Sequence, residues 1–270
     1  MTENRTKIIA EIGWNHMGDV NLAKEFIDAA KESGADYAKF QTWSVKNLKN
    51  GPWDSDGRKE IYQKAELTKE MHEELFEYCI KKKIKFLTSI FNFKDIYKVE
   101  NLDLNIIKLP SHEIYNLNLI KNLSLKYEKI LVSTGAAKWE EIIKISKLDE
   151  FEKIVFLHCV SSYPCNFDEL NFNKFFELKN ISKNEVGYSG HFHGIKDAII
   201  AITLHASFVE KHFTIDNNLP GRDNKFAILP KDLKELTNFN NDYSLMLSKK
   251  NKDLQENEMD IYNNYRGRWG

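Results

Sequence analysis

Residues 187–191 read Gly-Tyr-Ser-Gly-His, and residues 209–214 read Val-Glu-Lys-His-Phe-Thr. In each segment a histidine stands where a predicted β-strand gives way to a loop, and a helical stretch lies between the two. Neighbouring parallel strands end at the same edge of a sheet, where His191 and His212 can meet at one metal ion. The two segments therefore predict parallel β/α units and indicate an enzyme.

The rest of the chain repeats this alternation. Eight short apolar or β-branched runs predict strands at residues 7–11, 37–41, 85–89, 105–108, 129–133, 153–158, 185–188 and 208–211. Helical patterns follow them at residues 22–33, 68–82, 94–100, 117–125, 139–146, 172–178, 195–205 and 231–241. Eight β-then-α units with parallel crossovers predict an α/β fold, a closed TIM-type (β/α)8 barrel.

The composition fits one catalytic domain. A chain of 270 residues is long enough for one α/β barrel of about 250 residues. We expect residues 1–242 to form this barrel and residues 243–270 to form a tail that is not a separate domain. Basic residues number 39 and acidic residues 40, a net charge of −1, which argues against a nucleic-acid-binding or membrane-surface protein.

The sequence shows no pattern typical of export or membrane insertion. The first six residues have no apolar core, and no apolar run reaches the roughly 18 residues of a membrane span. We therefore expect a cytoplasmic protein that does not bind membranes. Cys79, Cys159 and Cys165 show no C-x-x-C spacing, so we interpret them as reduced, packed thiols.

One connection is far longer than the others. Residues 43–66 are polar, contain Gly51-Pro52 and exceed the usual length of a loop between a strand and a helix. We interpret this stretch as a functional loop over the carboxyl end of the barrel. A second irregular region is the charged tail, which includes Lys-Lys-Asn-Lys-Asp at residues 249–253 and ends in Tyr-Arg-Gly-Arg-Trp-Gly at residues 265–270.

Polar side chains follow the predicted strands, at the end of a barrel where its chemistry takes place. All eight strands contribute: Glu11 with Asn15 and His16, Lys39 with Gln41, Ser89, Lys108 with Ser111 and Glu113, Ser133, His158 with Ser161 and Tyr163, Ser189 with His191, and His212 with Asp223. The sequence therefore predicts one active site at the carboxyl end of the barrel.

In their order along the chain, these motifs resemble the sialic acid synthase family, whose members make nonulosonic acids from phosphoenolpyruvate and an acetamido sugar. The resemblance rests on Ile9–Gly13 with Asn15, His16, Gly18 and Asp19, on Lys39–Thr42, on Lys108 with Ser111 and Glu113, on Ser133–Gly135, on His158, Cys159, Ser161, Tyr163 and Pro164, on Gly187–Ser189 with His191, on Glu210–Thr214, and on Gly221 with Asp223. It implies a transferase that condenses phosphoenolpyruvate with an aldose and releases phosphate by C–O cleavage.

The resemblance implies that His191 and His212 bind a divalent metal, Mn²⁺ or Mg²⁺, with water and the sugar carbonyl oxygen as further ligands. Two imidazoles with open coordination positions suit a metal that polarises a bound aldehyde. Lys39 and Lys108 would supply positive charge for the phosphate and carboxylate of phosphoenolpyruvate. Hydrogen bonds to the substrates are expected from Ser89, Ser111, Ser133, Ser161 and Ser189.

The resemblance also assigns the remaining polar groups. Glu113 would deprotonate the water that attacks C2 of phosphoenolpyruvate. Glu11, Gln41, Tyr163 and Asp223 would orient the sugar and its hydroxyls. The catalytic candidates are thus Glu11, Lys108, Glu113 and Asp223.

Two segments depart from the family pattern. Family members typically read Tyr-Ser-Asp-His-Thr where this chain has Gly190 and Phe192 on either side of His191, so one acidic and one hydroxyl group near the metal are expected to be lost. Arg222 and Asn224 stand where proline and often histidine are usual. These departures affect the identity of the acceptor sugar more than the chemistry.

The carboxyl end departs as well. Family members usually carry an antifreeze-like domain that places an arginine in the partner subunit's site, and this chain stops before such a domain. Our hypothesis is that Arg266 or Arg268 covers a barrel mouth, its own or a neighbour's, with Tyr265 and Trp269 as anchors. A homodimer is the expected assembly, because barrels of this kind often dimerise.

Two alternatives to the synthase stay open at this point. Another metal-dependent aldol or condensing enzyme could use a different aldose on the same barrel, because a fold does not fix its chemistry. A barrel that has lost catalysis could bind a sugar or a partner enzyme, as Gly190 suggests. Under all three hypotheses the partners are small molecules or protein. For the synthase, the substrates are phosphoenolpyruvate and an aldose.

Overall fold

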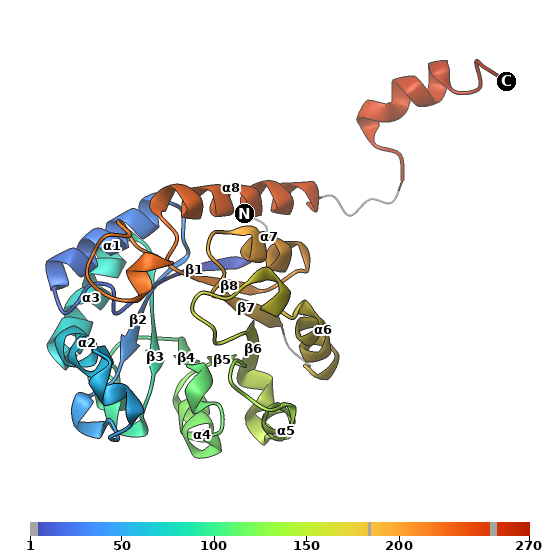
Figure 1. The fold of residues 1–270 in the computed structure, drawn as a ribbon. Helices are drawn as coiled ribbons and strands as arrows, with labels where there is room; N and C mark the ends of the chain where they lie inside the picture. Colours follow the sequence, from blue (N-terminus) through green and yellow to red (C-terminus); the bar gives the residue numbers. More distant parts are fainter. Residues whose placement is uncertain (1–4, 183–184, 249–252) are drawn as a thin grey trace.

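Eight parallel strands close into a barrel in a computed structural model that describes residues 5–182, 185–248 and 253–270 (Figure 1). The strands are β1 Lys7–Gly13, β2 Tyr37–Thr42, β3 Lys85–Ile90, β4 Ile106–Leu109, β5 Lys129–Ser133, β6 Ile154–Cys159, β7 Val186–Gly190 and β8 Phe208–His212. Each strand pairs with its neighbours in sequence, and β8 pairs with β1. The predicted TIM-type fold is confirmed.

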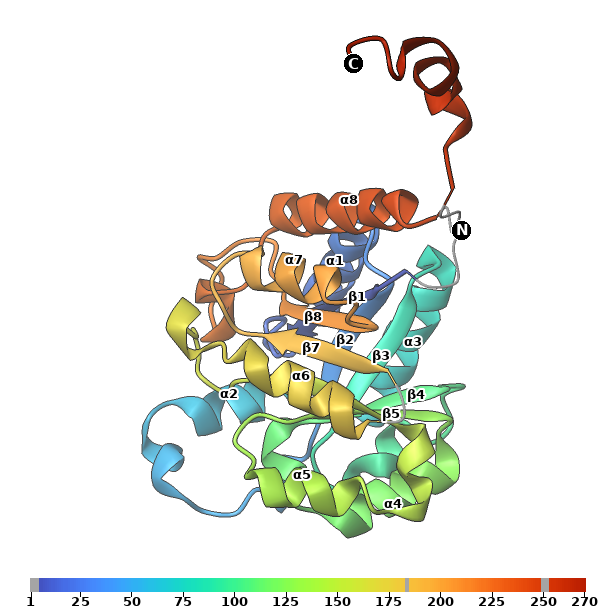
Figure 2. The same cartoon turned by 90° about the vertical axis from the view of Figure 1, so that its right-hand side faces the viewer.

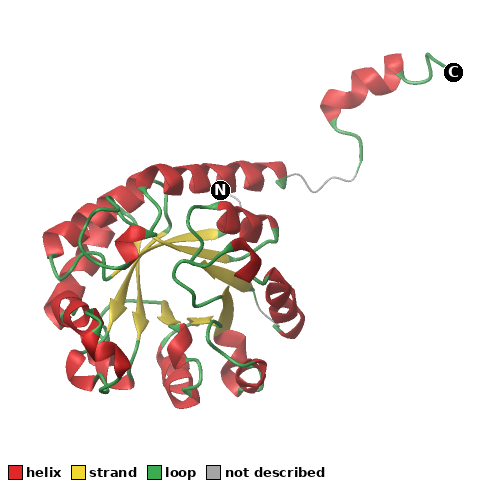
Figure 3. Cartoon of the chain, viewed as in Figure 1, coloured by secondary structure: helices red, strands yellow, loops and turns green. Residues whose placement is uncertain are grey.

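Helices surround the barrel (Figure 3). They are α1 Val20–Glu32, α2 Arg58–Ala65, α3 Lys69–Lys82, α4 Leu117–Lys126, α5 Trp139–Ile145, α6 Phe172–Ile181, α7 Lys196–Thr203 and α8 Pro230–Met246. The helical stretch predicted at residues 94–100 is a 3-10 helix, Phe93–Lys98, and not an α-helix. Helix α2 lies inside the long loop and was not predicted, and α8 continues five residues beyond the predicted end at residue 241.

Helix α1 shows why the sequence forms these elements. The Asp19 side chain caps the helix by accepting hydrogen bonds from the backbone N–H groups of Asn21 and Leu22. The buried side chains are Ala23, Phe26, Ile27 and Ala30, a spacing that lines one face of a helix. The helix ends at Ser33-Gly34, where Gly34 has a φ of +87°, as the sequence predicted for a helix stop.

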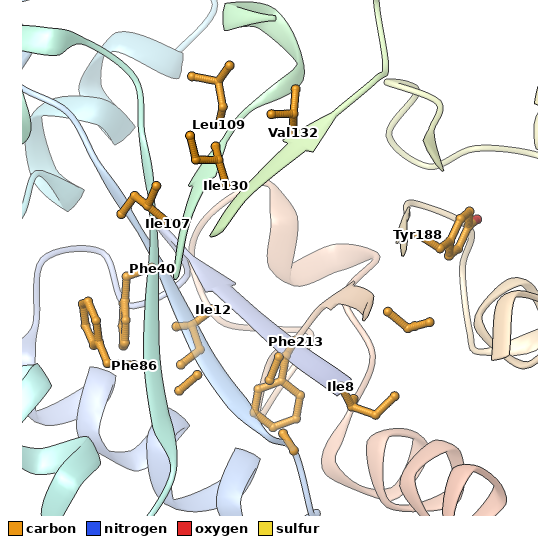
Figure 4. Close-up of a cluster of buried hydrophobic side chains, with 14 of the residues drawn as sticks. Ile8, Ile12, Phe40, Phe86, Ile107, Leu109, Ile130, Val132, Tyr188 and Phe213 are labelled. Atoms are coloured by element: carbon orange, nitrogen blue, oxygen red, sulfur yellow. The ribbon is translucent and has the colours of Figure 1, made fainter. Parts of the chain in front are cut away.

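The apolar core has two layers because strand side chains alternate. Outward-facing side chains pack against the helices, and Phe40 stacks on Phe86 with ring centroids 5.5 Å apart (Figure 4). The smaller inner layer fills the barrel and consists of Ile9, Tyr37, Leu87, Leu131, Val155, Leu157 and Phe208, with Ile106 packed against it. Two residues further along the strands the inward positions become polar, and the site begins there.

The carboxyl-terminal segment projects away from the barrel (Figures 1 and 2). Arg266 lies over the ring of its own Tyr262, 4.3 Å from the centroid, and Arg268 lies over Tyr265. Both arginines thus contact aromatic rings of their own segment, and a role at a barrel mouth stays a prediction. The predicted charged stretch at residues 249–252 lies outside the described residues. No described helix is long and apolar enough to span a bilayer.

Candidate active site

A cavity of about 1050 Å³ opens at the carboxyl ends of the strands. The fourteen residues that were assigned roles all line it: Glu11, Lys39, Gln41, Ser89, Lys108, Ser111, Glu113, Ser133, Ser161, Tyr163, Ser189, His191, His212 and Asp223. Asn15, His16 and His158, which also follow predicted strands, are not among its lining residues. The long loop at residues 43–66 also lines the cavity, as the sequence predicted for a loop over this end. The structure therefore brings the predicted residues together at one site, and their individual roles stay predictions.

Glu11 and Lys39 form a buried ion pair at the floor of the cavity. The Lys39 Nζ lies 2.6 Å from Glu11 Oε2, and Gln41 Nε2 donates to Glu11 Oε1 over 2.6 Å. The register of β1 and β2 places Glu11 directly beside Lys39. Burial lowers the pKa of Lys39 and raises that of Glu11, and the pairing of the two charges opposes both shifts.

Glu210 belongs to the same floor and had no predicted role. Its Oε1 accepts hydrogen bonds from Lys108 Nζ and, over 3.1 Å, from Ser189 Oγ, and its Oε2 lies 3.8 Å from Lys39 Nζ. Burial favours the neutral carboxyl, but Lys108 and Lys39 lower the pKa of Glu210 to about 2. The period of two along β8 could have found it, because Glu210 faces the same side as His212.

His191 and His212 face each other across the cavity, with ring centroids 5.4 Å apart. His191 Nδ1 lies 2.7 Å from the Val160 carbonyl oxygen, which orients the ring and leaves Nε2 for a ligand. Burial lowers the pKa of His212 well below its usual value, so this imidazole is neutral, the form that binds metals. Its Nδ1 lies 3.3 Å from Asp223 Oδ2.

The donor set around this pair fits an open metal site. Across residues 5–182, 185–248 and 253–270, no cluster of three or more His, Cys, Asp or Glu side chains with metal-binding geometry is found. Two imidazoles facing a cavity leave coordination positions for water and substrate, as catalytic metal sites require. His191 and His212 could hold such a metal together with oxygen ligands.

Asp223 is a buried carboxyl that lines the cavity. Burial, together with repulsion from Glu11, raises the pKa of Asp223 to about 7. Asp223 can therefore hold or release a proton near neutral pH. Beside it, the Tyr163 ring packs against His191, with centroids 4.1 Å apart and ring planes tilted by 43°, and its centroid lies 6.1 Å from that of His212.

Cys159 also lies in the cavity, next to His191. Its Sγ is 3.9 Å from His191 Nδ1 and accepts a 3.5 Å hydrogen bond from Ser111 Oγ. Burial disfavours the thiolate, but His191 and the hydrogen bonds lower the pKa of Cys159 to about 7. Cys159 is a free and buried thiol, as the sequence predicted, but its surroundings in the cavity are polar.

Three loops meet closely around Gly135. A Cβ at this position would lie 2.3 Å from Ser161 Oγ and 2.9 Å from both Cys159 Sγ and Ser111 Oγ. The Ser133 hydroxyl is buried and has no hydrogen-bond partner among the residues that the structure describes. A buried hydroxyl without a partner beside converging loops is suited to binding a polar ligand.

Glu113 lines the cavity from the 3-10 turn Ser111–Glu113 after β4. The side chain is partly buried, and burial raises its pKa, although a hydrogen bond from Asn116 favours the ionised form. A carboxylate with a raised pKa is a better proton acceptor than an ordinary glutamate. Glu113 can therefore take a proton from a water molecule in the cavity.

Comparison with known proteins identifies the family of the chain. The model of the NeuB family matches residues 26–252. The chain belongs to the NeuB family. The predicted resemblance to sialic acid synthases is thereby confirmed, and the chain is a nonulosonate synthase family enzyme. Members of this family are metal-dependent.

Several NeuB relatives are similar to the chain over most of its length. The N,N'-diacetyllegionaminic acid synthase of Campylobacter jejuni is 38% identical over 248 residues, which cover 86% of this chain and 74% of the relative. The pseudaminic acid synthase of the same organism is 32% identical and covers 84% of this chain and 70% of the relative. These NeuB enzymes differ in the sugar that their names state.

A solved NeuB structure shows the same barrel. The N-acetylneuraminic acid synthetase of Leptospira borgpetersenii, solved in complex with citrate, is 30% identical and superposes with a TM-score of 0.86. The comparison covers 98% of this chain and 93% of that chain. A truncated 3-deoxy-D-arabino-heptulosonate 7-phosphate synthase of Thermotoga maritima shares the fold at 16% identity and a TM-score of 0.67.

Proposed function

We propose that the protein condenses phosphoenolpyruvate with an acetamido aldose, such as N-acetylmannosamine or a diacetamido hexose, to form a sialic-acid-like acid and phosphate. The observation that carries this proposal is the cavity, where two lysines, two facing imidazoles and Glu113 converge. The names of the relatives, which include legionaminic and pseudaminic acid synthases, support an acetamido acceptor.

The floor of the cavity would bind phosphoenolpyruvate. Lys39 and Lys108 each carry three N–H donors, and their ion pairs with Glu11 and Glu210 hold the ammonium groups in place. The unpartnered Ser133 hydroxyl, and the Ser111 and Ser161 hydroxyls that converge near Gly135, favour the phosphate on the β5 side. The other serines of the cavity, Ser89 and Ser189, would complete the donors.

The reaction forms one carbon–carbon bond and breaks one carbon–oxygen bond. C3 of phosphoenolpyruvate attacks the aldehyde carbon, and the aldehyde oxygen becomes a hydroxyl. Water then adds to the cation-like C2 and passes one proton to Glu113, which balances the proton taken up by the aldehyde oxygen. The C2–O bond to phosphate breaks as the new C2 hydroxyl loses its proton to the leaving phosphate, and a 2-keto acid remains. Gln41, Tyr163 and Asp223 would orient the acceptor's hydroxyls while Glu11 holds Lys39.

His191 and His212 would hold the divalent metal, Mn²⁺ or Mg²⁺. When bound, such a metal supplies Lewis-acid polarisation of the acceptor's carbonyl oxygen. The hydrogen bond that His191 Nδ1 donates to the Val160 carbonyl oxygen fixes this ring in the orientation that a ligand needs.

Phosphate release tests the proposal. The protein would be incubated with phosphoenolpyruvate, Mn²⁺ and a panel of acetamido and plain aldoses, with His212→Ala as the control. We expect release that depends on an acetamido acceptor and is lost in the control. Release with a plain aldose would redirect the proposal to another condensing enzyme, and no release with any acceptor would contradict it.

A further inference from the structure

Gly190 ends strand β7 directly before His191, and a carboxylate fills the space beside it. A Cβ on Gly190 would lie 2.3 Å from Asp197 Oδ2, although the φ of Gly190 is not in the left-handed region. Glycine is therefore required here because a Cβ atom would clash with Asp197, and not because of the backbone conformation. Asp197 comes from helix α7, so an acid from the helix occupies the place of a side chain on the strand.

The Asp197 carboxylate has three hydrogen bonds from two neighbours. Lys211 Nζ lies 3.1 Å from Asp197 Oδ1 and 2.8 Å from Oδ2, and the Tyr188 hydroxyl donates to Oδ2 over 3.0 Å. The side chain of Asp197 is fully buried and that of Lys211 is 2% exposed. A buried charge without its partner is strongly unfavourable, so this pair holds a fixed geometry.

The Asp197–Lys211 pair contacts the backbone next to both histidines. The third hydrogen bond of Lys211 Nζ goes to the backbone carbonyl of Phe192 over 2.7 Å, one residue after His191. Lys211 itself precedes His212 on β8, and its Cα pairs with that of Gly190. One ammonium thus connects the loop that carries His191 to the strand that carries His212.

We infer that Asp197 is a positioning residue for the two imidazoles, acting through Lys211 on the backbone next to each. This inference rests on the proposed metal-binding role of His191 and His212. It also corrects the expectation that Gly190 removes an acidic group from this region, since the acid is present and comes from α7. A carboxylate at residue 190 could replace Asp197, provided that Asp197 is removed.

The experiment measures Mn²⁺ dissociation constants by electron paramagnetic resonance, together with Tm, for four variants. They are Asp197→Ala, Asp197→Asn, the double variant Gly190→Asp with Asp197→Ala, and Asp36→Asn. Asp36 is the matched control, because it pairs with Arg5 and accepts a bond from the Ile8 N–H on the outside of the barrel, away from the site. Asp197→Asn keeps the shape of the side chain, so it tests the inference if Asp197→Ala does not fold.

We expect Asp197→Ala to weaken Mn²⁺ binding by about 10-fold to 100-fold, the usual effect of losing an outer partner of a metal ligand. Asp197→Asn should show a smaller loss, and the double variant should return to within about threefold of wild type by the same reasoning. Asp36→Asn should lower Tm without changing the dissociation constant.

Two results separate the possible failures. Wild-type affinity for Mn²⁺ in Asp197→Ala and Asp197→Asn, or a double variant no better than Asp197→Ala, would overturn the positioning role while leaving the metal site intact. Absence of Mn²⁺ binding by the wild-type protein would overturn the metal role of His191 and His212, and the inference with it.

Discussion

Glu210 and Lys108 form a buried ion pair at the centre of the site, and the other oxygen of Glu210 lies 3.8 Å from Lys39. One carboxylate thus sits between the two ammonium groups that we assign to phosphoenolpyruvate. Without it, two buried like charges would face each other, and their pKa values and positions would change. Glu210 therefore stabilises the charged forms and the positions of both lysines at the floor of the cavity.

Replacing Glu210 by Gln should destabilise the protein. The substitution leaves Lys108 buried without its partner charge, and breaking a buried pair by removing one partner costs about 3 kcal/mol or more. Urea unfolding measures the loss. The double variant Glu210→Leu with Lys108→Met should recover part of it, and a double variant less stable than the single one would contradict this account.

Replacing Lys39 or Lys108 by Met should weaken the use of phosphoenolpyruvate. Each lysine would lose a charge-assisted hydrogen bond worth about 1.5–3 kcal/mol, so kcat/KM for phosphoenolpyruvate should fall by roughly 10-fold to 150-fold. KM for the acceptor should change little. Lys24→Met is the control, since Lys24 pairs with Glu74 on the surface. An equal effect on both substrates would argue against the assignment.

Replacing Glu113 by Gln should slow the chemistry and remove a pH dependence. Loss of a general base costs about 10²-fold to 10⁴-fold in kcat. Glu113 acts as a base only when ionised and burial raises its pKa, so wild-type kcat should fall as the pH drops through that raised value. The Gln variant should lack this acid limb while keeping its affinity for Mn²⁺. An unchanged acid limb would assign the base elsewhere.

Acid should unfold the barrel partly through three buried histidines. Burial lowers the pKa of His16, His72 and His158 from 6.5 to about 4. Between these values the unfolded chain binds more protons, so stability is complete above pH 6.5 and falls as the pH drops to about 4. Each histidine contributes at most about 1.4 kcal/mol per pH unit.

His72→Gln tests this pH dependence. The His72 ring contacts the Thr42 hydroxyl and the Thr68 carbonyl, which an amide can also contact. Stability measured by urea unfolding between pH 4 and 6.5 should fall less steeply with acid in the variant than in the wild type. Equal slopes would show that His72 is protonated in the folded protein.

The alternation of the strands made most of the site predictable from sequence. Residues at even spacing along a strand share a face, so inward positions such as Glu11, Lys39 and His212 follow from the strand assignments. Parallel strands then bring these positions to one end. The same rule applied to β8 predicts that Glu210 faces the site, because it lies two residues before His212.

Other features depend on tertiary contacts that no local sequence pattern predicts. Helix α2 is short and polar, and it is stabilised by packing, as Tyr62 lies against Trp14 and Trp43 with ring centroids 5.0 and 5.3 Å apart. The Asp197 carboxylate reaches Gly190 from a different element, seven residues on. Neither arrangement could be derived without the fold, because both are tertiary.

The most direct test of the proposed function uses phosphoenolpyruvate labelled with ¹⁸O at the bridging C–O–P oxygen, with Mn²⁺ and an acetamido aldose. C–O cleavage leaves the bridging oxygen on the phosphate, so we predict acceptor-dependent release of phosphate that carries the label, seen by mass spectrometry and absent in His212→Ala. Phosphate released without the label, or no release that depends on an acceptor, would contradict the proposed synthase.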